Sequence, residues 1–292
     1  MLIALTTGAL AASAPAHETP AERLQALENY EHARIRDQTP EAERNHLIVA
    51  EYDRLFPFSE AEIDGMPDDE LRSAFKASYI AAFFAMDQRV TSEVKGYLDA
   101  LQRRGIASDQ DFAKMHDIFV VTRMFDNANE IKAEHSALNL EKAPAIVGRP
   151  STRKPSKLAL SPQGDALIYQ PVDLRGKVIV VIAHPLCHFS VNAIKAISEQ
   201  PALSALFKGS VWLAPPGPRL NMPEIAKWND DHPGAALAFM DQRADWPMFD
   251  AWATPTFYFL NNGNIVAKVE GWPPVNGMDD LNRAAAKWNA AR

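Results

Sequence analysis

Residues 176–190 read GKVIVVIAHPLCHFS, an apolar run that leads directly into the only cysteine of the chain, Cys187. The near-continuous run of β-branched residues from Val178 to Ile182 predicts a central, buried strand. After the cysteine, Val191, Ile194 and Ile197 have the spacing of a helix. Cys187 is therefore predicted at a strand-to-helix junction, where unpaired N–H groups and the positive end of the helix dipole stabilise a thiolate and lower its pKa.

The rest of residues 158–292 alternates between strand and helix patterns. Asn261-Asn262-Gly263-Asn264 is a strong hairpin signal, and Ser161–Asp165 is a second, hairpin-like turn. Such alternation is typical of a sheet covered by helices. The predicted strands are 158–160, 166–169, 178–182, 211–214, 235–240, 257–260 and 265–269, and the predicted helices are 190–199, 223–228 and 278–291.

Four pieces of this half carry a family resemblance: Asp173–Val178, Cys187–Ser190, Thr254-Pro255-Thr256 and Asn261–Gly271. In this order, they make residues from about 157 to 292 resemble the thioredoxin superfamily, and within it the secreted redoxins with an inserted βα unit. The resemblance implies an α/β thioredoxin-like sandwich. It also implies that Pro255 follows a cis peptide bond and that the backbone of Thr254 binds an extended substrate segment in the manner of a β-strand.

The sequence departs from that family at two positions. Leu186 stands where an aromatic residue is usual before the first cysteine, and Ser190 stands where the second, resolving cysteine would be. Residues 187–190, with Pro185, also resemble the motif of monothiol glutaredoxins. The chain is longer than a glutaredoxin between Cys187 and Pro255, so this second resemblance is local.

The candidate catalytic residues are Cys187, His188 and Ser190. A protonated His188 would depress the thiol pKa further, although it can equally be a surface histidine. Ser190 can donate a hydrogen bond to the thiolate, or simply begin the helix. A hydroxyl is not ionised near neutral pH, so Ser190 cannot attack a mixed disulfide, and any mixed disulfide at Cys187 must be resolved by an external thiol.

Three other interpretations of the cysteine stay open. Cys187 can be a buried relic in a redox-inactive interaction module, since free cysteines often act as small hydrophobes. With His184 and His188 it forms an H-x-x-C-H cluster that would suit copper or zinc, but a closed zinc site needs four ligands. A one-cysteine peroxidase would need hydroxyl and arginine side chains around the thiolate, and position 184 is a histidine. We expect no cofactor and no metal.

The first half of the chain has the pattern of helices. Residues 20–140 are predicted to be an all-α helical bundle or a degenerate helical-repeat domain. One helix is predicted to start after Thr39-Pro40, which would supply an N-cap and an N1 proline, and another at Asp68. The proline-rich, basic stretch 141–157 is predicted to be the linker to the thioredoxin-like domain, 158–292. The resemblance covers nothing before this linker.

Charge and the first residues set further limits. The net charge of −7 argues against nucleic-acid binding, which needs a basic face. Beyond the extreme N-terminus, no apolar run is long enough to span a membrane. Residues 1–16 are typical of an export signal, with small-residue cleavage at Ala14-Pro15-Ala16, although no Lys or Arg precedes the apolar run. The predicted location is therefore periplasmic or secreted.

Together these observations predict an exported thioredoxin-like protein. It would use one thiol for mixed-disulfide exchange with protein thiols or disulfides, as a monothiol thiol–disulfide oxidoreductase. The helical domain would bind a partner. Trp246 and Trp252 lie shortly before Thr254-Pro255-Thr256, which we call the proline loop. They are predicted to be packing residues rather than a ligand cage.

Overall fold

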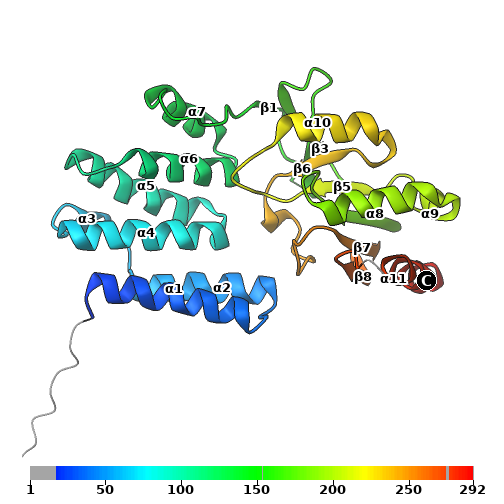
Figure 1. Cartoon of the computed structure of the whole chain (residues 1–292), viewed down its shortest axis with the longest axis horizontal. Helices are drawn as coiled ribbons and strands as arrows, with labels where there is room; N and C mark the ends of the chain where they lie inside the picture. The colour runs from blue at the N-terminus through cyan, green and yellow to red at the C-terminus, as the bar shows by residue number, and fades with distance from the viewer. Residues whose placement is uncertain (1–17, 153, 274–275, 292) are drawn as a thin grey trace, which may run out of the picture.

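The structure is a computed structural model that describes residues 18–152, 154–273 and 276–291. The predicted export signal, residues 1–16, lies outside the described residues. Helices come first along the chain, and a mixed sheet with helices on it follows (Figure 1).

The first half is a stack of helices in which sequence neighbours pack on one another (Figure 1). Several helices begin where the sequence supplies a cap. Thr19 and Glu22 form a capping box, as do Ser108 and Asp111, and the side chain of Asp87 accepts from the N–H of Val90. The helices are α1 (Pro20–Arg36), α2 (Glu41–Leu55), α3 (Glu60–Ile63), α4 (Asp68–Ala85), α5 (Gln88–Arg103), α6 (Asp109–Val121) and α7 (Phe125–Glu134).

Helix α2 begins after Thr39-Pro40, as predicted, but its cap differs from the prediction. Pro40 is the N-cap rather than the first helical residue, and no side chain caps the helix. Glu41 is therefore the first residue of α2, at the positive end of the helix dipole. This places its carboxylate against the other half of the molecule.

The chain turns sharply between α6 and α7. Arg123 has a left-handed backbone, with φ of 60°, which ends the helix. Its buried guanidinium donates through Nε and Nη2 to the carbonyl of Met240, at 3.1 and 2.7 Å. The break thus places a buried arginine between the helical half and the sheet.

The second half is built on one mixed sheet with the strand order β1-β3-β2-β6-β5-β4-β7-β8. The three strands β4, β5 and β6 are parallel neighbours, and β7 runs antiparallel to β4. The strands are β1 (Ala145–Val147), β2 (Ser156–Leu160), β3 (Ala166–Pro171), β4 (Lys177–Ile182), β5 (Val211–Ala214), β6 (Leu237–Met240), β7 (Thr256–Asn261) and β8 (Asn264–Glu270). The α-helices are α8 (His188–Glu199), α9 (Pro201–Leu206), α10 (Met222–Asp231) and α11 (Gly277–Ala290).

The stretch 141–157, predicted to be a linker, also contributes to the sheet. Its residues Ala145–Val147 form β1 and pair in parallel with Ala166–Ile168 of β3. Without β1, β3 would be the edge strand and would have unpaired N–H and C=O groups. The short extended segment of β1 pairs with these groups. Prolines on either side of β1 hid that pairing from a composition-based prediction.

The two faces of the sheet are covered differently. Alternate residues of a strand point to opposite faces. Ile179 and Val181 of β4 join a large apolar cluster with α8–α11 that continues into the helical half. Val180 and Ile182 pack instead against Trp246, Phe249 and Trp252, which lie in the coil before β7. Both tryptophans are buried, so their prediction as packing residues is confirmed.

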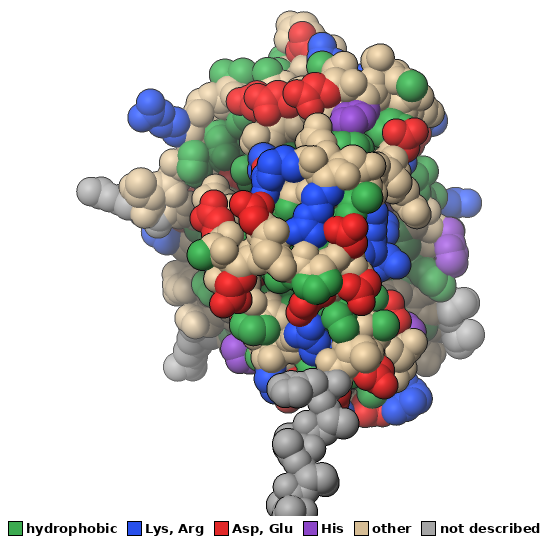
Figure 2. Space-filling model, turned by 90° about the vertical axis from the view of Figure 1, so that its left-hand side faces the viewer, with side chains coloured by type: hydrophobic (Ala, Val, Ile, Leu, Met, Phe, Trp, Pro, Cys, Tyr) green, Lys and Arg blue, Asp and Glu red, His purple; other side chains and the backbone are tan. Residues whose placement is uncertain are grey.

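The surface of the helical half carries charges of both signs. Figure 2 shows acidic and basic side chains interleaved over the end of the stack. Ion pairs also join the ends of neighbouring helices, such as Arg104 with Asp68 at 2.7 Å. Within the described ranges, no helix is both long and apolar enough to cross a membrane.

Candidate functional site

Cys187 is the N-cap of α8, directly after the central strand β4. Its N–H donates to the carbonyl of His184 at 3.0 Å, and its carbonyl accepts from the N–H of Val191 at 3.1 Å. These two bonds fix the turn that carries the chain from strand to helix. The cysteine is half-buried, so the sulfur lies at the helix N-terminus with access to solvent.

The proline loop faces this thiol. Because β7 pairs with β4, with Thr256 opposite Ile182, the residues just before β7 lie beside the end of β4. The Thr254–Pro255 peptide bond is cis. Sγ of Cys187 donates to the carbonyl oxygen of Thr254 at 3.1 Å. Residues 67 positions apart in sequence are thus brought into direct contact.

The environment lowers the pKa of the Cys187 thiol. Burial alone would raise this pKa, since it disfavours the charged form. The Thr254 side chain, the N–H and hydroxyl of Ser190 and the N–H of Phe189 favour the charged sulfur, and together they outweigh the effect of burial on the pKa. These donors favour the thiolate, as expected for a sulfur at a helix N-terminus.

Ser190 lies beneath the thiol and is completely buried. Its hydroxyl accepts from the N–H of His184 at 3.3 Å and also acts on the sulfur of Cys187. The Ser190 side chain is thus a hydrogen-bonding group within the site. The two roles considered for it, donor to the thiolate and first-turn residue, are compatible in this geometry.

The two histidines have different surroundings. Burial lowers the pKa of His184, against the opposing charge of Glu224. Its Nδ1 accepts from the N–H of Leu186 at 3.2 Å, so His184 is a neutral part of the turn. His188 is exposed, and its ring lies on that of Phe189 with 3.8 Å between centroids.

The surface around the thiol is apolar. Leu186, Phe189 and Val191 are 63%, 39% and 42% exposed. In the described part of the chain, they are three of the six large hydrophobic residues that are exposed, and all lie within four positions of Cys187. Exposed apolar side chains gathered in one place indicate a contact surface for another molecule.

The H-x-x-C-H cluster is not assembled as a metal site. No group of three or more His, Cys, Asp or Glu side chains among residues 18–152, 154–273 and 276–291 is placed to hold an ion. His184 is instead engaged with the N–H of Leu186 and lies 3.5 Å from the amide nitrogen of Asn221.

A cavity lies away from the thiol. It has a volume of about 710 Å³ and lies between α8, α9 and the end of α10. Ile197, Phe207, Trp212 and His232 are among the residues that line it. None of the candidate residues from the sequence lines this cavity, so it is separate from the thiol chemistry.

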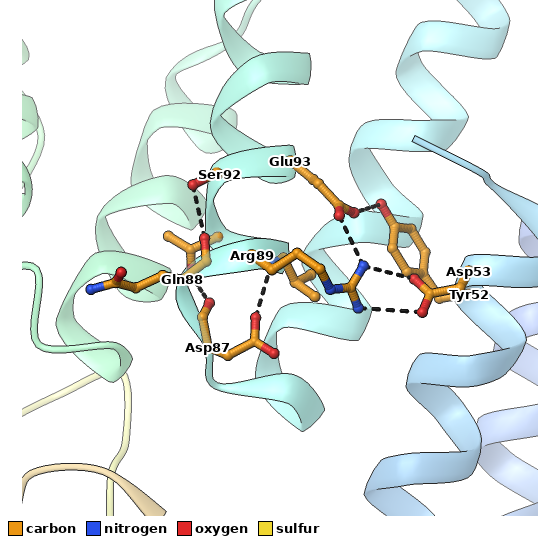
Figure 3. Close-up of polar contacts among 9 residues, drawn as sticks. Tyr52, Asp53, Asp87, Gln88, Arg89, Ser92 and Glu93 are labelled. Carbon is orange, nitrogen blue, oxygen red and sulfur yellow. Dashed lines mark hydrogen bonds and ion pairs between the residues drawn. The ribbon is translucent and has the colours of Figure 1, made fainter. Parts of the chain in front are cut away.

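Another polar cluster lies within the helical half (Figure 3). The hydroxyl of Tyr52 on α2 donates to Glu93 on α5 at 2.8 Å. Arg89 donates to the other oxygen of Glu93 at 2.9 Å and to both oxygens of Asp53. Burial, with the nearby acidic charges, raises the pKa of Tyr52 far above its ordinary value, so this tyrosine stays protonated. The cluster joins helices and presents no ionised nucleophile.

Sequence reasoning missed two acidic residues that hold the loops beside the thiol. Oε2 of Glu41 accepts from the N–H of Trp252 at 2.8 Å, and Oε2 of Glu141 accepts from the N–H of Leu220 at 2.9 Å. Trp252 immediately precedes the proline loop, and Leu220 precedes Asn221 beside His184. In the sequence, both glutamates look like ordinary surface residues, because their contacts are to backbone groups far along the chain.

No protein-family model matches this chain, and no curated protein matches it. The chain is similar to the solution structure of a candidate thioredoxin from Neisseria meningitidis, with 18% identity and a TM-score of 0.32, over 47% of this chain and 91% of that one. It is also similar to the crystal structure of a thioredoxin-like protein from Bacteroides caccae, with 13% identity and a TM-score of 0.32, over 99% and 100% of the two chains. Likeness at this level says nothing about which residues act.

Proposed function

We propose that this chain is a monothiol thiol–disulfide exchange protein of the thioredoxin type, with Cys187 as its nucleophile. The observation that carries the proposal is the half-exposed thiol at the N-terminus of α8, whose pKa is lowered by hydrogen bonds. A thiolate, and not a thiol, attacks disulfides. The lowered pKa raises the fraction of thiolate at neutral pH.

The reaction is an exchange of disulfide bonds. The Cys187 thiolate attacks one sulfur of a partner disulfide, forming a Cys187–partner mixed disulfide and releasing the second partner sulfur as a thiolate. An external thiolate then attacks the mixed disulfide, takes over the partner sulfur and regenerates the Cys187 thiolate. Each step forms one S–S bond and breaks one; Cys187 is oxidised in the first step and reduced in the second, so its redox state is unchanged over the whole cycle.

Ser190 makes the external thiol necessary. The buried hydroxyl stabilises the Cys187 thiolate but cannot displace a partner sulfur. A mixed disulfide at Cys187 therefore persists until another thiol arrives. A long-lived covalent complex is the expected signature of this chain.

The surroundings of Cys187 suit a protein partner. The apolar side chains of Leu186, Phe189 and Val191 border the thiol and can contact the apolar neighbours of a partner cysteine. The backbone of Thr254 lies against the sulfur, where an extended segment carrying that cysteine can pair with it. The helical half supplies further surface for recruiting a partner.

We further propose that the protein works in the periplasm or is secreted, on the strength of the pattern in residues 1–16. In such an oxidising compartment, an unpaired cysteine meets disulfides of other exported proteins. Fractionation of the native host, combined with N-terminal sequencing of the protein, tests this location. Recovery of the protein with residue 1 intact from the cytoplasm would contradict it.

The reactivity of the thiol is tested by alkylation with iodoacetamide as a function of pH. Cys187 is the only cysteine, so every alkylated molecule reports on this site. We expect a midpoint below the value of about 8.5 for an ordinary cysteine. A midpoint at or above that value overturns the proposal. Unfolded protein in denaturant is the matched control, because it carries the same thiol without its environment.

Partners are identified with non-reducing gels of the protein isolated from its host. We expect an adduct that disappears on reduction with dithiothreitol and is absent from the Cys187→Ser variant. Mass spectrometry of the reduced adduct then names the partner.

A redox-inactive interaction module is the second candidate function. The exposed apolar side chains around Cys187 favour it, because they can hold a partner without a covalent bond. The Cys187→Ser variant discriminates the two. If it captures the same partner with unchanged affinity and supports the same phenotype, the interaction module is correct.

A further inference from the structure

The loop that faces the thiol is held by the helical half of the molecule. Glu41 is the first residue of α2, and its Oε2 accepts from the backbone N–H of Trp252 at 2.8 Å. Its other carboxylate oxygen, Oε1, pairs with Nη1 of Arg243 at 3.1 Å. One carboxylate thus binds two points of the coil that leads into the proline loop.

This contact is enclosed and has several partners. The side chains of Glu41 and Arg243 are 19% and 20% exposed. The guanidinium of Arg243 lies over the ring of Trp252, 5.5 Å from its centroid. With its amide oriented to satisfy both neighbours, Asn45 accepts from Arg243 at 2.9 Å and donates to the Glu41 carbonyl at 3.0 Å. The charge of Arg44 acts on Arg243 as well.

Only a short segment separates this contact from the thiol. Thr254 lies two residues after Trp252, a span of at most about 7 Å of backbone. Between them, the carbonyl of Ala253 accepts from the hydroxyl of Thr256 at 2.7 Å. The segment is therefore fixed at Trp252 by Glu41 and at Ala253 by β7. Thr254 then meets Sγ of Cys187 at 3.1 Å.

We propose that Glu41 is a positioning residue for Cys187: from the helical half, it fixes the backbone that presents Thr254 to the sulfur. The inference rests on the proposed thiol chemistry and deepens it. It gives the helical half a role in that chemistry besides the recruitment of partners. Any partner that displaces α2 would change the reactivity of the thiol.

The test compares the pH profile of Cys187 alkylation in four proteins: wild type, Glu41→Ala, Glu41→Gln and Glu43→Ala. Glu43 lies in the same first turn of α2, is exposed and has the same charge, so its replacement is the matched control. For Glu41→Ala, we expect the midpoint to shift by about 0.7 pH unit from that of Glu43→Ala, the effect of roughly one lost hydrogen bond at the sulfur.

Glu41→Gln keeps an oxygen that can accept from Trp252 but loses the charge that pairs with Arg243. We therefore expect a smaller shift in the same direction. Circular dichroism establishes that each variant is folded. Should Glu41→Ala fail to fold, Glu41→Gln decides: a shift supports the inference, and a profile identical to that of Glu43→Ala overturns it.

A double-mutant cycle tests whether Glu41 acts through Thr254. The Thr254→Val background removes the hydroxyl but keeps the carbonyl that accepts from Sγ, so the effect of Glu41→Ala on the alkylation profile should persist there. An effect that disappears in this background overturns the proposed route through the backbone.

These results separate the inference from the proposed function. A reactive wild-type thiol with identical profiles in Glu41→Ala and Glu43→Ala removes only the role of Glu41. If Cys187 of the wild type has the alkylation profile of an ordinary cysteine and forms no reducible adduct, the proposed thiol chemistry itself is ruled out.

Discussion

The surroundings of Tyr52 and those of Cys187 shift the pKa of these two side chains in opposite directions. Around Tyr52, burial and the carboxylates of Glu93 and Asp53 raise the pKa of the phenol. Around Cys187, hydrogen-bond donors from Ser190, Phe189 and Thr254 lower the pKa of the thiol despite its partial burial. The clusters differ in the partner supplied: carboxylates favour the protonated tyrosine, whereas amides and hydroxyls favour the ionised cysteine.

The comparison also separates a structural cluster from a reactive one. Tyr52 is completely buried, and its single oxygen joins α2 to α5. The sulfur of Cys187 is half-exposed and has apolar, solvent-facing neighbours. The buried Tyr52 hydroxyl with its fixed partner contributes to stability, whereas the partly exposed Cys187 sulfur with several donors is suited to react.

The largest effect is expected for Glu93→Ala in the structural cluster. The substitution leaves the Tyr52 hydroxyl buried without its acceptor and Arg89 without one of its two carboxylates. We expect a loss of about 3 kcal/mol in the free energy of unfolding. Urea denaturation measures the loss, with Asp53→Ala as the exposed control from the same cluster. A loss below that of Asp53→Ala would contradict the structural role.

The fold of the second half could be predicted because its signals are local. The apolar run of β4 and the turn Asn261–Asn264 are readable in single segments. The edge strand β1 was missed because its reason for forming is the unpaired edge of β3, which no local pattern reveals. The break after α6 has no local signal either, because Arg123 is held there by the carbonyl of Met240, 117 residues away.

The residues of the candidate site also differ in whether their signal is local in the sequence. Cys187, Ser190 and Thr254 were predicted because a strand–helix junction and a proline loop are visible in the sequence, and in the structure the three residues lie together. Glu41 and Glu141 could not be found, because each accepts from a backbone N–H, and backbone groups carry no sequence signal.

The next effect in size is expected for Tyr52→Phe, which removes one oxygen atom and little else. Glu93 loses one hydrogen bond but keeps its pair with Arg89. Since hydrogen bonds to charged groups contribute about 1.5–3 kcal/mol, we expect a loss near the lower end of that range. The alkylation profile of Cys187 should stay unchanged. A shift in that profile would show that the two clusters are coupled.

Ser190→Ala is the matching deletion of one oxygen in the reactive cluster. The thiolate loses a donor, and the N–H of His184 loses its acceptor at 3.3 Å. We expect a loss of about 1 kcal/mol in thiolate stabilisation, which is about a five-fold slower alkylation at neutral pH. The measurement is the same pH profile, run beside Tyr52→Phe. An unchanged profile would mean that the hydroxyl only begins the helix.

The smallest effect is the dependence of stability on pH that Cys187 contributes. Its pKa is lowered in the folded state, so the folded protein releases its proton at a lower pH than the unfolded chain. The resulting stability is present above the ordinary cysteine value of about 8.5 and is lost as pH falls through the lowered folded pKa. The difference in unfolding free energy between wild type and Cys187→Ser should therefore rise with pH within that window and level off above it. Because the thiol is partly exposed to solvent, the rise is small, and urea denaturation at closely spaced pH values is needed to resolve it. A difference that falls with pH would mean that the donors at α8 do not outweigh burial, and Cys187 would then belong with Tyr52 among the inert acids.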